Sequence, residues 1–223
     1  MSDLVLHVGL PKTATTSLQN YWFRRVPNYL GKSKKDKGAS GRGKAATDLL
    51  SLVEKAYSGA AESTLRPEVE GWRKQWVRTG SQMHRETDET PFLLSEEVLV
   101  RWMTDAALSS QWPLRTGIRA LPDLRARPSP ISVFLKTYKE ALWPDGKIKI
   151  LLTLRNQPDW LASLYSQISN TVPNAGQADF VQKVDALLAS DDTYLDWAAW
   201  IDEMAEVVGQ ENVCALPMEM MSE

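Results

Sequence analysis

The sequence predicts an α/β protein in which helices flank a central, mainly parallel β-sheet, giving three layers. Four short apolar runs have the length and composition of strands: LVLHVG (4–9), PFLLSE (91–96), KIKILLTLR (147–155) and NVCALPME (212–219). Segments with helical periodicity separate these runs, and strands that alternate with helices usually pair in parallel. The runs are also nearly continuous in apolar character, as expected of strands that are buried on both faces.

Length and composition are those of one globular domain spanning residues 1–223, with 43% hydrophobic and 24% charged residues. The net charge of -2 provides no global attraction to nucleic acid or to a membrane, so neither is an expected partner. No apolar run approaches the ~18 residues of a membrane span, and the N-terminus lacks a signal-peptide pattern. We therefore expect a cytoplasmic protein without stable membrane insertion. With one cysteine, Cys214, and two histidines, neither a disulfide framework nor a metal site is expected.

The N-terminal part begins with the strand over 4–9 and continues into a helix from about Thr15. Three residues are placed on the inner face of this helix: Leu18, Tyr21 and Trp22. Residues 31–44, GKSKKDKGASGRGK, cannot supply an apolar face and are predicted to form a mobile basic loop. Helical periodicity returns over 45–57 and 65–78.

The rest of the chain alternates in the same way. The strand over 91–96 is followed by a helix, and residues 113–130, rich in Pro and Arg, are expected to be irregular. The helix after the strand carries Val98, Trp102 and Met103. A helix over 131–142 precedes 147–155, which has the strongest strand character in the chain. Two helices and the last strand follow, over 177–189, 193–208 and 212–219.

The segment between the first strand and its helix has the features of an anion-binding loop. Because the strand ends at Gly9 and the helix starts near Thr15, free backbone N–H groups and the positive end of the helix dipole converge there. Lys12 adds a point charge, and hydroxyl donors follow at Thr13, Thr15, Thr16 and Ser17. These features make the predicted fold P-loop-like. An ordinary strand-to-helix turn with a solvated lysine is the alternative.

This loop differs from the one that binds ATP or GTP. That loop needs G-x-x-x-x-G-K-[ST], with the lysine after the second glycine and a hydroxyl for magnesium. Here Lys12 comes three residues after Gly9, and no Gly-Lys pair follows within the loop, before the helix that starts near Thr15. The loop is therefore suited to a smaller group than a β/γ-phosphate pair with its metal.

Residues 11–17, PKTATTS, resemble the first motif of the sulfotransferase family, P-K-[ST]-G-[ST]-[ST]. The resemblance implies that this loop grips the 5′-phosphosulfate of 3′-phosphoadenosine 5′-phosphosulfate (PAPS). The cofactor-binding residues would then be Pro11, Lys12, Thr13, Ala14, Thr15, Thr16 and Ser17. Ala14 stands where the family usually has glycine. This departure is mild if the backbone there is helical and unfavourable if it requires a positive φ.

A second match follows the strand over 147–155. The family places an arginine at the end of a strand and a serine eight residues later, and both hold the 3′-phosphate of PAPS. Arg155 and Ser163 have that spacing, Asp159 falls where the family often has aspartate, and Pro158 lies one position late. An arginine fork and a hydroxyl suit a phosphate dianion. The alternative is a capped surface helix with Arg155 in a salt bridge.

Sulfuryl transfer needs a base for the acceptor hydroxyl, usually His or Glu. Glu96 and Glu97 lie at the end of a buried strand, where α/β sheets open their sites, and a resemblance to the L-S-x-E of carbohydrate-directed bacterial members selects Glu97. The alternative is that Ser95 caps the next helix and the glutamates satisfy its N-terminus. His7, inside a strand, is better explained as a core histidine, and His84 lies in a polar segment.

Two further features have open interpretations. The basic loop over 31–44 either steers an anion or is a solvated surface loop, and the latter is favoured. Several of the nine tryptophans could stack on sugar rings, although core packing is the commoner use. The tryptophans concerned are Trp72, Trp76, Trp102 and Trp112.

The resemblance implies a PAPS-dependent sulfotransferase that uses no metal, with Lys12 near the bridging oxygen and a carbohydrate or other small molecule as the acceptor. A small-molecule kinase with a degenerate P-loop, or a non-catalytic anion- or nucleotide-binding module, are the alternatives. Family members usually continue past the last strand into a helix and a basic segment. The 1–223 domain is therefore either C-terminally truncated or completes its 3′-phosphate pocket from elsewhere. The sequence names neither the acceptor nor the oligomeric state.

Overall fold

The computed structural model describes residues 2–9, 13–31, 43–83, 90–96, 99, 129–144, 146–169, 172, 174–189 and 196–221. Its sheet contains four strands, which are β1 (Leu4–Gly9), β2 (Phe92–Ser95), β3 (Ile148–Leu154) and β4 (Val213–Pro217). All three strand pairs are parallel, in the order β2-β1-β3-β4. The α/β class and the parallel sheet predicted from the sequence are confirmed.

The register aligns the carboxyl ends of the strands. His7 of β1 pairs with Ser95 of β2, and Gly9 pairs with Thr153 of β3. Thr153 pairs in turn with Leu216 of β4. Since the strands are parallel, the segments that follow them emerge at one edge of the sheet, where ligand sites of open α/β sheets form.

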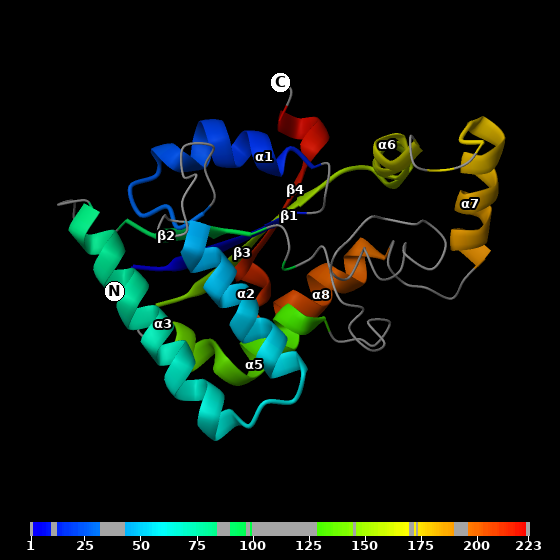
Figure 1. The fold of residues 1–223 in the computed structure, drawn as a ribbon. Helices are drawn as coiled ribbons and strands as arrows, with labels where there is room; N and C mark the ends of the chain where they lie inside the picture. Colours follow the sequence, from blue (N-terminus) through cyan, green and yellow to red (C-terminus); the bar gives the residue numbers. More distant parts are fainter. Residues whose placement is uncertain are drawn as a thin grey trace.

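One face of the sheet, here called the core face, carries Leu4, Leu6 and Val8 of β1 and is covered by a helical layer (Figure 1). The helices of this layer are α2 (Gly43–Tyr57), α3 (Glu62–Met83), α5 (Pro130–Leu142) and α8 (Trp197–Val208). Trp72 and Trp76 of α3 are 5% exposed and belong to this core, so packing is their role.

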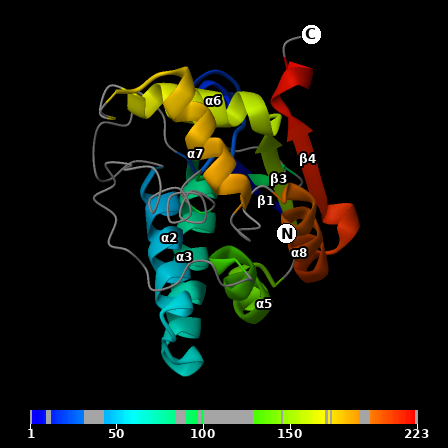
Figure 2. The same cartoon turned by 90° about the vertical axis from the view of Figure 1, so that its right-hand side faces the viewer.

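The opposite face, here called the loop face, carries Val5 and His7 and is covered by residues 15–25. This segment comprises α1 (Thr15–Ser17), the π-helix η1 (Leu18–Trp22) and the 3₁₀-helix η2 (Phe23–Arg25). Phe23, Tyr29 and Leu93 form a small apolar cluster on this face. Two more helices, α6 (Gln157–Ile168) and α7 (Gln177–Ala189), lie beyond the carboxyl edge (Figures 1 and 2).

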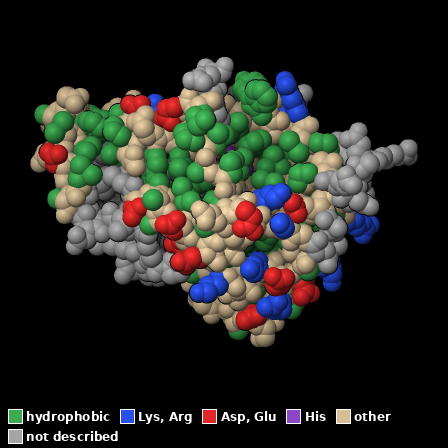
Figure 3. Space-filling view, turned by 180° about the vertical axis from the view of Figure 1, so that it is seen from behind, with side chains coloured by type: hydrophobic (Ala, Val, Ile, Leu, Met, Phe, Trp, Pro, Cys, Tyr) green, Lys and Arg blue, Asp and Glu red, His purple; other side chains and the backbone are tan. Residues whose placement is uncertain are grey.

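The predicted inner face of the first helix is wrong at two positions. Tyr21 is 55% exposed and Trp22 is 66% exposed, whereas Gln19 and Phe23 are buried. The π-helical turn is wider than an α-helical one, so the inward positions recur every fourth residue, at Thr15, Gln19 and Phe23. Figure 3 views the molecule from behind relative to Figure 1 and shows hydrophobic side chains gathered across the upper part of that view.

Several boundaries also differ from the predictions. Helix α2 begins at Gly43, so Gly43 and Lys44 belong to it, and Lys44 pairs with Asp48 one turn later at 2.6 Å. Strand β4 is shorter than predicted and is followed by the 3₁₀-helix η6 (Met218–Met221).

Some predicted features lie outside the described residues. They are the basic residues 32–42, His84, the segment 113–128, and Val98, Trp102, Met103 and Trp112. In the part of the chain that the structure describes, no helix has both the length and the apolar character needed to span a bilayer.

Candidate functional site

The end of β1 and the start of α1 approach each other closely at Gly9. A Cβ atom at this position would overlap the methyl group of Thr15 and the hydroxyl of Thr153. Glycine is therefore required here because the returning chain packs directly on the strand end. Leu10, Pro11 and Lys12, between these points, lie outside the described residues.

The backbone of Ala14, which stands where the family motif has glycine, has a positive φ. Its backbone has φ 56° and ψ 14°, which is left-handed, and it directly precedes α1. The position therefore has the conformation that glycine adopts without strain, and an alanine there carries a steric cost. The backbone at this one position is that of a glycine, while the residue is alanine.

The hydroxyl residues of the motif divide into two pairs. Thr13 and Thr15 are buried, at 0% and 3% exposure, whereas Thr16 and Ser17 are exposed. The Thr13 hydroxyl lies 3.0 Å from the hydroxyl of Thr153 on β3. Thr13 thus connects the loop to the neighbouring strand.

His7 lies beneath this loop and is fully buried. Its Nδ1 is 2.7 Å from Oγ of Ser95, and its Nε2 is 3.3 Å from Oγ1 of Thr153. The edge of its ring also packs on Phe23, with centroids 4.8 Å apart. Burial lowers the pKa of His7 to about 4, because charging the ring would remove it from water. The prediction of a satisfied core histidine is confirmed.

The predicted phosphate-binding arginine follows β3 directly. Arg155 is half-buried, and within the described residues its guanidinium makes no hydrogen bond and no ion pair. Glu219, from η6, accepts hydrogen bonds from Asn156 N and Nδ2, both at 3.0 Å. The backbone bond from Asn156 lowers the pKa of Glu219, and the charge of Arg155 lowers it further. The predicted alternative was a salt bridge of Arg155. Among the described residues, Arg155 instead interacts with Glu219 by electrostatic attraction, without an ion-pair contact.

Helix α6 explains the displaced proline. Asn156 is the N-cap, and its Oδ1 accepts a hydrogen bond from Asp159 N at 3.0 Å. Pro158 is then in the first turn, where its missing N–H costs nothing. Asp159 therefore takes part in the start of this helix. Ser163 lies on the same helix and is half-buried.

The predicted base cannot be located, because Glu97 lies outside the described residues. Its neighbour Glu96 is 0% exposed, and its backbone N–H extends the sheet by bonding to His7 O at 3.2 Å. The Ser95 hydroxyl contacts His7 and Gln19, and the start of the helix that Ser95 would cap in the alternative interpretation lies outside the described residues.

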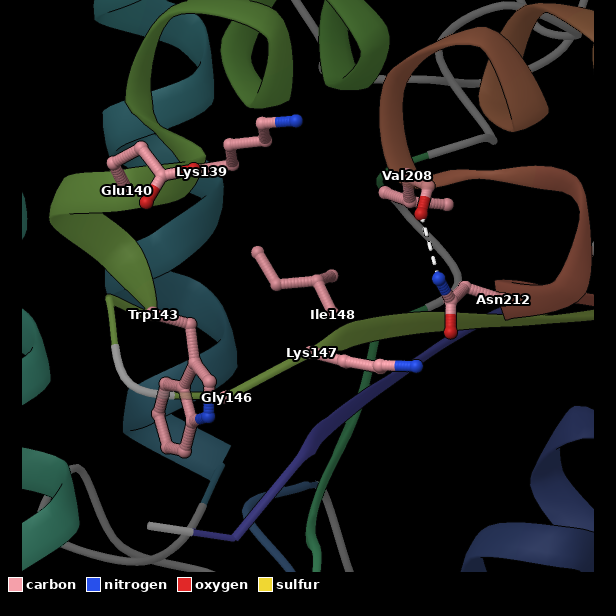
Figure 4. Close-up of a pocket in the computed structure, with 8 residues that line it drawn as sticks. All are labelled: Lys139, Glu140, Trp143, Gly146, Lys147, Ile148, Val208 and Asn212. Atoms are coloured by element: carbon pink, nitrogen blue, oxygen red, sulfur yellow. Dashed lines mark hydrogen bonds between the residues drawn. The ribbon is translucent and has the colours of Figure 1, made fainter.

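A pocket of about 140 Å³ lies at the opposite edge of the sheet, around the start of β3 (Figure 4). Its polar groups stabilise the end of α8: Lys139 Nζ donates to Val207 O at 3.1 Å, and Asn212 Nδ2 to Val208 O at 2.8 Å. These bonds satisfy helix carbonyls, so the lining has a structural explanation.

Sequence reasoning missed Gln19 and Thr153. Gln19 Nε2 donates to Ser95 Oγ at 2.9 Å from a buried position, which the predicted inner face of the helix did not include. A signal for Thr153 was present, since it is a hydroxyl residue inside the otherwise aliphatic end of the strongest strand.

Comparisons of the chain with models of protein families, with curated proteins and with solved structures found no match. The site is therefore interpreted from its own geometry.

Proposed function

We propose that this protein is a PAPS-dependent sulfotransferase, which transfers a sulfuryl group to a hydroxyl of an acceptor, with a carbohydrate as the favoured class. One observation carries the proposal. The two segments that resemble sulfotransferase motifs are about 140 residues apart in sequence, yet they follow the adjacent parallel strands β1 and β3. A ligand with phosphate groups on both the 3′ and the 5′ positions of its ribose would need both segments at one edge of the sheet.

The residues present fit such a ligand. The left-handed backbone at Ala14 and the requirement for glycine at Gly9 support a tight turn between β1 and α1, and backbone N–H groups in such turns are a usual way to bind an anion. Arg155 keeps its guanidinium free of bonds to the described residues, as a phosphate-binding arginine needs. Glu219 beside it is a competing anion, which a bound phosphate would have to tolerate.

PAPS would supply the sulfuryl group, and the chain would supply charge and orientation. Lys12 would stabilise negative charge on the bridging oxygen, while Thr13, Thr15, Thr16 and Ser17 contribute hydroxyl donors along the loop. Glu97 would accept the proton of the acceptor hydroxyl. Arg155 and Ser163 would hold the 3′-phosphate.

Ligand-induced stabilisation tests this assignment without knowledge of the acceptor. We expect 3′-phosphoadenosine 5′-phosphate to raise the melting temperature in the absence of metal, and ATP and ADP to do so less. Preference for ATP with magnesium would instead favour a small-molecule kinase. No stabilisation by the 3′-phosphorylated nucleotide would contradict the proposal.

The Lys12→Ala variant tests the chemical step, which is the transfer of the sulfuryl group. We expect its transfer rate to fall by ~10²–10³-fold, as when one charge-stabilising donor is removed. Circular dichroism should show an unchanged fold, because the role proposed for Lys12 is charge stabilisation in the bound complex, and a single charge of this kind adds little to folding stability. If wild-type protein binds the nucleotide but transfers sulfate to none of a panel of sugars, a non-catalytic binding module becomes the better explanation.

A further inference from the structure

Five buried polar side chains form one continuous series under the loop. Gln19 Nε2 bonds to Ser95 Oγ at 2.9 Å, and Ser95 Oγ lies 2.7 Å from His7 Nδ1. His7 Nε2 lies 3.3 Å from Thr153 Oγ1, which lies 3.0 Å from Thr13 Oγ1. Four of these residues are 0% exposed and Gln19 is 7% exposed. The series joins η1, the three adjacent strands β2, β1 and β3, and Thr13 before α1.

The number of protons on each side chain determines which atom donates and which accepts in each hydrogen bond of the series. Among the described residues, the Ser95 hydroxyl contacts the Gln19 amide and the His7 ring. It accepts from the amide N–H, so its single proton goes to Nδ1 of His7. Nδ1 is then an acceptor, and the ring carries its proton on Nε2.

The same count continues on the other side of the ring. His7 Nε2–H donates to Thr153 Oγ1, and the Thr153 proton then goes to Thr13 Oγ1. Thr13 accepts this bond, so its own proton is directed away from Thr153. The opposite direction would use the Thr13 proton inward and leave the buried Ser95 proton without an acceptor among these partners.

We propose that this series is a one-way hydrogen-bond relay in which His7, as the neutral Nε2–H tautomer, is a positioning residue that orients the Thr13 hydroxyl as a donor to the bound anion. The inference rests on the proposed function for the identity of that anion. The direction of the relay does not depend on it.

Histidine suits this position because it bridges two strands at once. Ser95 and Thr153 lie on the strands that flank β1, and neighbouring strands are about 4.8 Å apart. The imidazole presents an acceptor and a donor on opposite sides of a rigid ring, so it can bond to both neighbours. Asparagine reproduces the Nδ1 position alone, and glutamine reproduces the Nε2 position alone.

Nitrogen NMR tests the direction of the relay without any ligand. The chain has two histidines, so a His84→Gln variant assigns the signals of His7. Long-range ¹H–¹⁵N spectra at pH 7 should show His7 as the neutral Nε2–H tautomer. An Nδ1–H tautomer or a protonated ring would overturn the proposal.

Binding of 3′-phosphoadenosine 5′-phosphate tests the positioning role. His7→Asn keeps a partner for Ser95 but loses the donor to Thr153, so we expect affinity to fall roughly fivefold to tenfold. His7→Gln keeps that donor and should recover most of the affinity. Thr153→Val should match His7→Asn, and combining the two should add no further loss.

A control separates positioning from general stability. Ser132→Ala removes a hydroxyl that is also buried, at 3% exposure, and bonded to Ser129 at 2.8 Å on α5. It should lower the melting temperature and leave nucleotide affinity unchanged. Equal losses for His7→Asn and His7→Gln, or no loss for either, would remove His7 from the role. If wild-type protein binds no nucleotide, the proposed function fails, while the tautomer still decides the relay.

Discussion

The two parts of the candidate site differ in how they are built. In the first, here called the loop corner, Thr13, Thr15 and His7 are almost fully buried and hydrogen bonds join the loop to the strands. In the second, here called the arginine corner, Arg155 precedes α6 and Ser163 lies in the middle of this helix, which has its own N-cap, and both residues are half-buried.

This difference determines how mutations should act. A buried polar group that loses its partner costs about 1–3 kcal/mol, so changes in the loop corner alter stability together with binding. The arginine corner is held by the Asn156 cap and by Glu219, so Arg155 can change without loosening the helix. The predictions below test this separation, beginning with the largest effect.

Glu97→Gln should slow turnover by ~10²–10⁴-fold while leaving nucleotide affinity nearly unchanged, because an amide keeps the shape of the carboxyl but accepts no proton. Steady-state rates and a nucleotide titration measure the two quantities. Glu96→Gln is the matched control, and its buried side chain should make the rate insensitive to the change. A fast Glu97→Gln enzyme would rule out the assignment, and a slow Glu96→Gln enzyme beside it would identify the neighbour as the base.

The loop corner should make stability depend on pH. His7 has a pKa of about 4 in the folded protein and 6.5 as its ordinary value, so the unfolded chain binds more protons between these limits. The free energy of unfolding should therefore fall as pH decreases from 6.5 to 4, by roughly 3 kcal/mol in total.

Urea unfolding of wild type and His7→Gln at several pH values measures this contribution. The difference between the two proteins should change across the window, since glutamine does not titrate. If the difference in free energy of unfolding were the same at every pH, His7 would not be buried as described. The loop corner would then not differ from the arginine corner in this respect.

Arg155→Ala should weaken binding of 3′-phosphoadenosine 5′-phosphate by ~1.5–3 kcal/mol, the usual worth of hydrogen bonds to a charged group. Calorimetry with this nucleotide and with adenosine 5′-phosphosulfate, which lacks the 3′-phosphate, separates the two ends of the ligand. Affinity for the second ligand and the melting temperature should change little. Equal losses for both ligands would remove Arg155 from the role.

Ala14→Gly should stabilise the protein by about 0.5–1 kcal/mol, because glycine adopts the left-handed backbone at φ 56° without strain. Ala162, exposed within α6, provides the control. Ala162→Gly should destabilise by a similar amount, since glycine is unfavourable inside a helix. Chemical denaturation of both variants gives the signs, and two destabilising substitutions would mean that Ala14 is not strained.

Local patterns were sufficient for the elements of the sheet and for most helices. The run KIKILLTLR became β3 and the periodicity over 131–142 became α5, because continuous apolar character and helical spacing are properties of neighbouring residues. The same reasoning failed at Tyr21 and Trp22. There, a wide helical turn changed which residues face the sheet, and no local pattern indicates such a turn.

The sequence by itself determined the α/β class, the order of the strands along the chain, and the two segments that resemble sulfotransferase motifs. It could not determine that Gln19, Ser95, His7, Thr153 and Thr13 form one hydrogen-bonded series, because these residues come from five separate elements. Nor could it decide whether Ala14 requires a positive φ. Both depend on strand register and on how closely the loop packs over Gly9, and these are set only when distant segments meet in the folded chain.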